Sequence, residues 1–112
     1  SLEDSSDVAF VIAADLMICE AALAAGEPGA ALAASTHAAD LHRARGLEDL
    51  QGVPTPALWW WHREALRASG KHAEAKRALA LAYRFVMRAI GKVTARARSL
   101  PTHAGNRRAA HR

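Results

Sequence analysis

Cysteine is nearly absent from this chain of 112 residues, because Cys19 is the only one. A single thiol excludes an internal disulfide framework and a zinc site built from paired cysteines. The reducing cytoplasm is therefore the expected compartment. The first residues, SLEDSSD, are acidic and polar, which is unlike a secretory signal peptide.

Aromatic residues and long apolar runs are also scarce. Aromatics make up 5% of the chain, whereas alanine fills 28 positions. Alanine favours helices and lets them pack closely, but it buries little area per residue. The most apolar stretch, VAFVIAADLMICEAALAA, is interrupted by Asp15 and Glu20. We interpret it as a buried amphipathic helix and expect no membrane partner.

The charges are divided unevenly along the chain. Residues 1–51 hold nine acidic and two basic residues, a balance of −7, and residues 52–112 hold two and thirteen, a balance of +11. This asymmetry is typical of a protein that meets a polyanion or an acidic partner, or that associates with itself. We expect self-association, most simply as a symmetric dimer.

The pattern in the first half predicts two helices and no strands. Apolar residues recur at helical spacings of three and four, at Val8, Ile12, Leu16, Cys19 and Leu23. Gly26 is expected to end this helix, and Pro28 suits the first turn of the next one. The second helix is predicted from Pro28 to Arg45, with Gly46 after it.

The second half predicts a connection followed by two more helices. Residues 46–55 belong to GLEDLQGVPTP, whose two glycines and two prolines favour a loop, with one short turn at Leu47–Leu50. Thr55 is the expected cap of a helix from Pro56 to Ser69, and Gly70 follows it. The last helix is predicted from Lys71 to about Arg98, with Gly91 and Thr94 as places to bend or fray. A tail over 99–112 contains NRRAAHR, the expected start of a fifth helix.

The two halves share a layout at an offset of 44 residues. Gly26 and Gly70 each lie between the two helices of one predicted pair. Ala31 and Ala75 follow five residues after these glycines, and Ala38 and Ala82 follow seven residues further on. Helix–turn–helix units at a fixed period predict a helical array in which each pair packs on the next.

These positions resemble tetratricopeptide (TPR) repeats. The match over residues 56–98 includes a glycine at the turn, an early aromatic and small residues in the second helix, namely Trp59, Leu66, Gly70, Ala75, Leu79 and Ala82. In residues 7–45, Gly26, Ala31 and Ala38 match, whereas Asp15 stands in place of the aromatic and Ser35 in place of a larger residue. The resemblance implies an all-α fold of two antiparallel TPR-like hairpins, forming one helical-repeat domain over 1–112 at the end of a longer superhelical array.

The stretches PALWWWHREALRASGKHAEAKRALALAY and LPTHAGNRR are similar to units that close long-repeat arrays in large bacterial signalling proteins. Those proteins include transcriptional activators, nucleotide cyclases, kinases and diguanylate cyclases. The resemblance implies a non-catalytic module for protein–protein interaction or for linking adjoining domains, without a cofactor.

The three consecutive tryptophans cannot share one helix face. At about 100° per residue, Trp59 and Trp61 lie on neighbouring stripes that we expect in the core. Trp60 points away from both. It is expected either on a binding groove or beneath the 46–55 connection, and loop cover is slightly favoured.

The sequence offers no catalytic constellation. His37 and His42 are five residues apart and so do not form a helical metal-ligand pair, and Cys19 has no basic neighbour within one turn. The alternative function is nucleic-acid binding through a basic series on the last helix, formed by Arg77, Arg84, Arg88, Lys92 and Arg96. Without a recognition motif, this alternative ranks second to a protein interaction surface that includes Trp60.

Overall fold

The fold consists of four helices in a computed structural model that describes residues 4–99. The helices are α1 (Asp4–Ala24), α2 (Pro28–Ala44), α3 (Thr55–Ala68) and α4 (His72–Ser99). Residues 4–99 contain no strand. The predicted all-α class with a long last helix is confirmed. Beyond Ser99, the predicted tail and its fifth helix lie outside the described residues.

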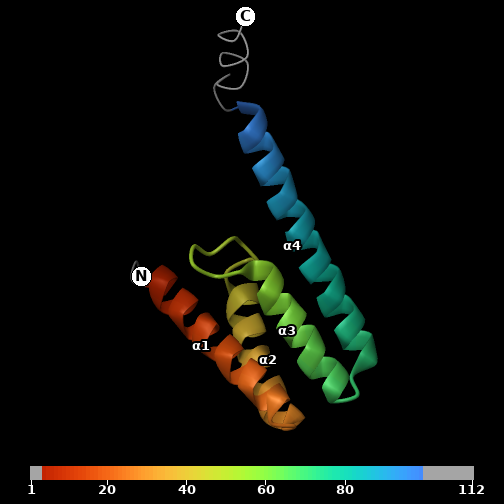
Figure 1. Ribbon diagram of the computed structural model, residues 1–112. Helices are drawn as coiled ribbons and strands as arrows, with labels where there is room; N and C mark the ends of the chain where they lie inside the picture. Colours follow the sequence, from red (N-terminus) through yellow and green to blue (C-terminus); the bar gives the residue numbers. More distant parts are fainter. Residues whose placement is uncertain (1–3, 100–112) are drawn as a thin grey trace, which may run out of the picture.

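The helices form two antiparallel hairpins that lie side by side (Figure 1). Helix α1 pairs with α2 and α3 pairs with α4, while α3 also packs on α2 and touches α1. Helix α4 packs along α3, and its Phe85 ring also reaches His42 of α2, with 5.6 Å between the ring centres. Helices α1 and α4 are therefore the two edges of the fold, and the C-terminal half of α4 projects beyond its neighbours (Figure 1).

The two hairpin turns have the same backbone geometry at the predicted offset of 44 residues. Gly26 and Gly70 adopt φ of 74° and 78°, a left-handed conformation that glycine adopts without a steric penalty. The following residue closes each turn: the Glu27 N–H donates to Ala22 O and the Lys71 N–H donates to Leu66 O, both at 2.8 Å. Gly26 and Gly70 thus end equivalent helices, as predicted.

Small alanines and a few large side chains together form the buried core. Ala31 and Ala38 are fully buried, and their counterparts Ala75 and Ala82 are nearly so. The largest fully buried side chains are Trp59, Ile12, Leu58 and His42. Phe85 on α4 belongs to a cluster of buried apolar residues that connects all four helices.

The connection between the hairpins differs in detail from the prediction. The expected turn at Leu47–Leu50 is absent, because Gly46 and Leu47 both adopt positive φ and redirect the chain. The turn lies further on, where the Val53 N–H donates to Leu50 O at 3.0 Å. Thr55 is the first residue of α3 and not its cap, because Pro54 occupies the cap position. Helix α4 runs through Gly91 and Thr94 without a break.

Candidate interaction surface

Trp59 is fully buried and fixes α3 against α2. Its indole Nε1–H donates to Nδ1 of His42 at 3.0 Å. Indole nitrogen is only a donor, so Nδ1 of His42 carries no proton and Nε2 donates to Glu48 O at 2.9 Å. His42 therefore joins α2, α3 and the connection. We expected Trp59 in the core, but its histidine partner was not anticipated.

A second buried histidine joins α2 to α3. Nδ1 of His62 lies 2.8 Å from the Ser35 hydroxyl, which donates to Leu32 O. Burial, with a smaller effect of the Arg43 charge, lowers the pKa of His62 to about 4, so the ring is neutral at pH 7. The small Ser35, which departs from the TPR pattern, leaves room for this imidazole.

Cys19 lies beside this pair but is not placed as a nucleophile. It is fully buried, and its thiol donates to Trp61 O at 3.7 Å. Burial raises the pKa of Cys19, which keeps the thiol protonated. The neighbouring His62 is bonded to Ser35, so the three side chains act as packing and hydrogen-bonding groups between α1, α2 and α3.

Asp15 occupies the position in α1 that Trp59 occupies in α3. Its carboxylate accepts a hydrogen bond from Nδ1 of His37 at 2.6 Å, and the side chain is nearly buried. A polar pair across the first hairpin thus replaces the aromatic anchor of the second. The spacing from Asp15 to His37 gave no signal of this pairing in the sequence.

The other two tryptophans take different positions. Trp61 is partly buried and packs against both core clusters, which agrees in part with its predicted core position. Trp60 is 40% exposed and lies beneath the Arg63 guanidinium, 4.8 Å from the ring centre. The 46–55 connection does not line the space beside Trp60, so the expectation of loop cover is wrong. The reason is that α4 packs along this side of α3.

An apolar groove of about 340 Å³ runs between α3 and α4 beside Trp60. We call it the Trp60 groove, and it is lined by Pro56, Ala57, Trp60, Leu79, Ala82, Tyr83 and Val86. Leu79 was expected among the packed repeat positions, but it is 37% exposed because none of the helices α1, α2 and α3 covers this side of α4. Apart from the tyrosine hydroxyl, every lining side chain offers carbon surface or an indole ring.

The groove continues as an apolar stripe along α4. Its members follow alternating spacings of four and three residues, at Leu79, Tyr83, Val86, Ile90 and Val93. This spacing is typical of a helix that packs against another helix. All five side chains are exposed among the described residues, and Tyr83 is 66% exposed. The stripe is therefore an apolar helix face without a cover in the described part of the chain.

The predicted basic series lies on a different side of α4. Arg77, Arg84, Arg88, Lys92 and Arg96 are all exposed. At roughly 100° per residue, the series centres about 170° away from the apolar stripe. Arg88 lies over the Phe85 ring, and Lys92 donates to Asp49 in the connection and lowers the pKa of that carboxyl group.

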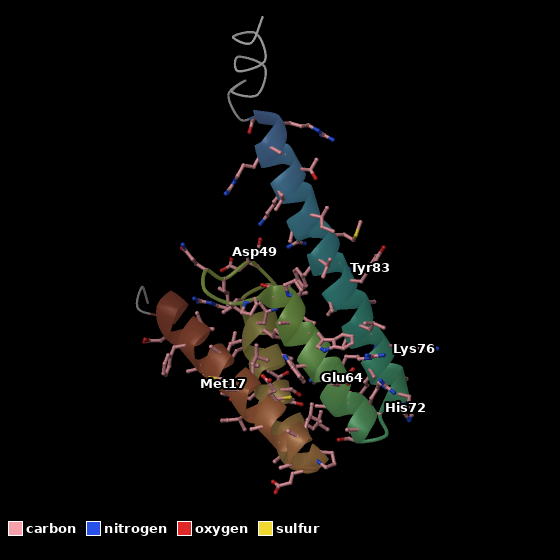
Figure 2. All side chains as sticks on the ribbon, in the orientation of Figure 1. Met17, Asp49, Glu64, His72, Lys76 and Tyr83 are labelled. Atoms are coloured by element: carbon pink, nitrogen blue, oxygen red, sulfur yellow. The ribbon has the colours of Figure 1, made fainter. Side chains whose placement is uncertain are left out.

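Helix α1 presents a second uncovered apolar face, on the opposite edge of the fold. Phe10 and Met17 are 75% and 71% exposed, and Ile18 is 53% exposed. In Figure 2, Met17 projects from the outer side of α1, while Tyr83 projects from the far side of α4. Two helix faces at opposite edges of one small fold are thus available for contact.

Within residues 4–99, no helix has the length and hydropathy needed to cross a bilayer, and no three His, Cys, Asp or Glu side chains gather as metal ligands. The chain matches no protein-family model, no curated protein and no solved structure. The exposed surfaces of the molecule are therefore the guide to its function.

Proposed function

We propose that the chain is a non-catalytic module for protein–protein interaction or for linking adjoining domains, built from TPR-like hairpins. The proposal places it in the cytoplasm, in a bacterial signalling or transcription-regulatory protein. One observation supports it above the others. The Trp60 groove and the stripe on α4 are an exposed apolar helix face, while the equivalent face of α2 is covered by α3.

The shared turns support the repeat character of the fold. Both hairpins close with the same hydrogen bonds 44 residues apart, and the small residues that follow are buried in both. Helical repeats bury their faces on neighbouring units, so an uncovered outer face is a place for a further unit or a partner. The hairpins over 7–45 and 56–98 are accordingly proposed as consecutive units near the end of an array.

The full-length gene product provides the test. A catalytic, ATP-binding or DNA-binding domain on the same polypeptide supports a linking or interaction role in regulation. In such a protein, Val86→Asp in the Trp60 groove should alter the regulated output, whereas Ala95→Asp on the basic side of α4 should not. A gene product without any further domain would contradict the signalling role.

Nucleic-acid binding is the second candidate, and the exposed basic side of α4 favours it. Helix α4 carries seven Lys or Arg side chains and one Glu, and its projecting end is open to solvent. Cations of this kind attract phosphate backbones without reading sequence. We expect a random DNA duplex to bind no tighter than ~10⁻⁶–10⁻⁴ M at physiological salt. Nanomolar binding would place this function first.

A further inference from the structure

We propose that the Trp60 groove receives helix α1 of a second copy of this chain, so that chains join head to tail. The inference rests on the proposed interaction function, and it names the partner and the two faces that meet. The groove and the outer face of α1 are the two uncovered apolar surfaces described above. The contact between α2 and α3 inside the chain shows how they fit together.

The contact between α2 and α3 inside one chain is the model for the proposed contact, because the same repeat positions meet 44 residues earlier. Subtracting 44 from the residues of the Trp60 groove gives their counterparts in the first hairpin, Ile12, Ala13, Leu16, Ser35, Ala38, Ala39 and His42. Six of these seven are buried and Ala13 is partly buried. They are covered because α3 lies over them, with His62 on Ser35 and Trp59 on His42. The Trp60 groove is the same surface one repeat later, without its covering helix.

Helix α1 is the repeat equivalent of the covering helix α3. The outer residues Val11, Met17 and Ile18 correspond to Thr55, Trp61 and His62. In the internal contact, His62 meets Ser35 through a hydrogen bond. In the proposed contact, the corresponding pair is Ile18 of one copy and Leu79 of the other. Both are apolar and exposed, so their contact removes carbon surface from water.

Charge selects α1 as the occupant in preference to a second α4. Helix α1 contains four carboxylates and no Lys or Arg, a charge of −4. Helix α4 contains seven Lys or Arg and one Glu, a charge of +6. The whole-helix charges of α1 and α4 are opposite, whereas two α4 helices would each bring +6. Because the basic series lies on the side of α4 away from the stripe, this attraction acts over a distance and not through ion pairs inside the groove. Charge complementarity of this kind suppresses the wrong pairing and sets orientation.

The lengths of the two helices also agree. Helix α3 starts at Thr55, the counterpart of Val11, but α1 starts seven residues earlier, at Asp4. Helix α2 ends at Ala44, the counterpart of Arg88, but α4 continues for 11 residues to Ser99. In the internal contact, the start of α3 lies beside the end of α2. The same antiparallel arrangement places the extra turns of α1 along the extra turns of α4, with Phe10 near the Ile90 end of the stripe.

The proposed head-to-tail contact does not close into a pair in which all contact faces are used. Helices α1 and α4 do not touch and lie at opposite edges of the fold, so one contact leaves a free face at each end of the pair. A head-to-tail interface without closure adds further copies as concentration rises. This arrangement differs from the symmetric dimer expected from the charge pattern, because a two-fold contact would require one patch to meet itself.

The test is the mass of the 112-residue chain in solution, measured by sedimentation over a range of concentrations at low salt. The wild-type mass should increase with concentration. Ile18→Asp on α1 and Val86→Asp on α4 should each stay at the monomer mass of 12.0 kDa. Ala95→Asp adds the same charge outside the groove and should behave as wild type. Circular dichroism of each variant verifies that its helices have formed.

A mixture of the Ile18→Asp and Val86→Asp chains tests whether α1 of one copy occupies the Trp60 groove of another. The Ile18→Asp chain keeps an intact groove and the Val86→Asp chain keeps an intact α1, so an equimolar mixture should form one contact and reach twice the monomer mass. A wild-type chain that stays monomeric overturns the inference. Association that persists in Ile18→Asp also overturns it, because α1 is then not the occupant. Either failure leaves the proposed interaction function to its own test in the full-length gene product.

Discussion

The two hairpins share their turns and their close-packed alanines, but they differ in whether the outer face of the second helix is covered. The first hairpin presents Ser35, Ala39 and His42 to α3 and all three are fully buried. The second presents Leu79, Tyr83 and Val86 at the same repeat positions, and all three are exposed. The more apolar set is the uncovered one. Exposure in this fold is therefore decided by whether a next helix is present and not by the polarity of the side chain.

The comparison also shows two ways to hold a hairpin on its neighbour. Inside the chain, α2 and α3 are held by the bonds from His42 to Trp59 and from Ser35 to His62. Such bonds require fixed geometry, and a buried group that loses its partner is costly. The outer face of α4 offers mainly apolar side chains, such as Leu79, Tyr83 and Val86.

The buried Trp59 should contribute far more to the stability of the fold than its exposed neighbour Trp60. Trp59→Ala removes a fully buried ring and leaves the His42 nitrogen unpaired, so we expect a loss of ~3–5 kcal/mol in the free energy of unfolding. Trp60→Ala is the matched control and should cost much less, because Trp60 is already 40% exposed. Urea denaturation followed by circular dichroism measures both. Equal losses would contradict the assignment of the two faces.

The buried His62 should make the fold sensitive to acid. Its pKa is about 4 in the folded chain and near the ordinary 6.5 when unfolded, so between these values the unfolded state binds more protons. Stability should therefore fall as pH drops from about 6.5 to 4, reaching a loss of roughly 3 kcal/mol below pH 4, since each pKa unit corresponds to ~1.36 kcal/mol.

The His62→Gln variant isolates that contribution from the other titrating groups. Glutamine keeps a polar group near Ser35 but does not titrate. The difference in unfolding free energy between wild type and variant should change with pH across this window and level off above it. A constant difference from pH 4 to 7 would show that His62 does not carry the acid sensitivity.

The close helix contact at the start of α4 should resist a larger side chain. Ala75 is 3% exposed, and Ala75→Leu forces the helices apart, with an expected cost of ~1–3 kcal/mol. Ala80→Leu places the same side chain on an exposed side of α4 and should have little effect on the melting temperature. An unchanged melting temperature for Ala75→Leu would contradict the equivalence of Ala31 and Ala75.

Salt should weaken the contact between copies only in part. Raising ionic strength from about 0.05 M to 1 M shortens the screening length from over ~10 Å to about 3 Å. The attraction between α1 and α4 is then largely screened, whereas the apolar contact in the Trp60 groove is not. Light scattering at both salts should show reduced but continuing association. Complete dissociation in 1 M salt would show that charge alone holds the copies together.

The helices and their turns could be predicted from the sequence because their signals are local. Gly26 and Gly70 end helices through their own backbone freedom, and the apolar spacing of α1 is visible residue by residue. The direction of Trp60, away from Trp59, also followed from the helix angle, but its exposure did not, because cover by the 46–55 connection was slightly favoured. What escaped prediction depends on pairs that are distant in sequence. His42 meets Trp59 across 17 residues, and Asp15 meets His37 across 22. No spacing rule reveals such partners, because they depend on how α2 is rotated against its neighbours.

The projecting end of α4 implies an uneven distribution of local stability. All side chains of residues 86–99 are exposed, and Lys92 makes an ion pair with the connection at Asp49. An isolated helical segment of fewer than ~12–15 residues is marginal in water, so the last turns should open without unfolding the rest. Their amide hydrogens should exchange with solvent much faster than those of α3. A partner that covers the stripe would slow amide exchange in these last turns. Binding at the Trp60 groove would then be detectable at the far end of α4, as a helix that opens less often.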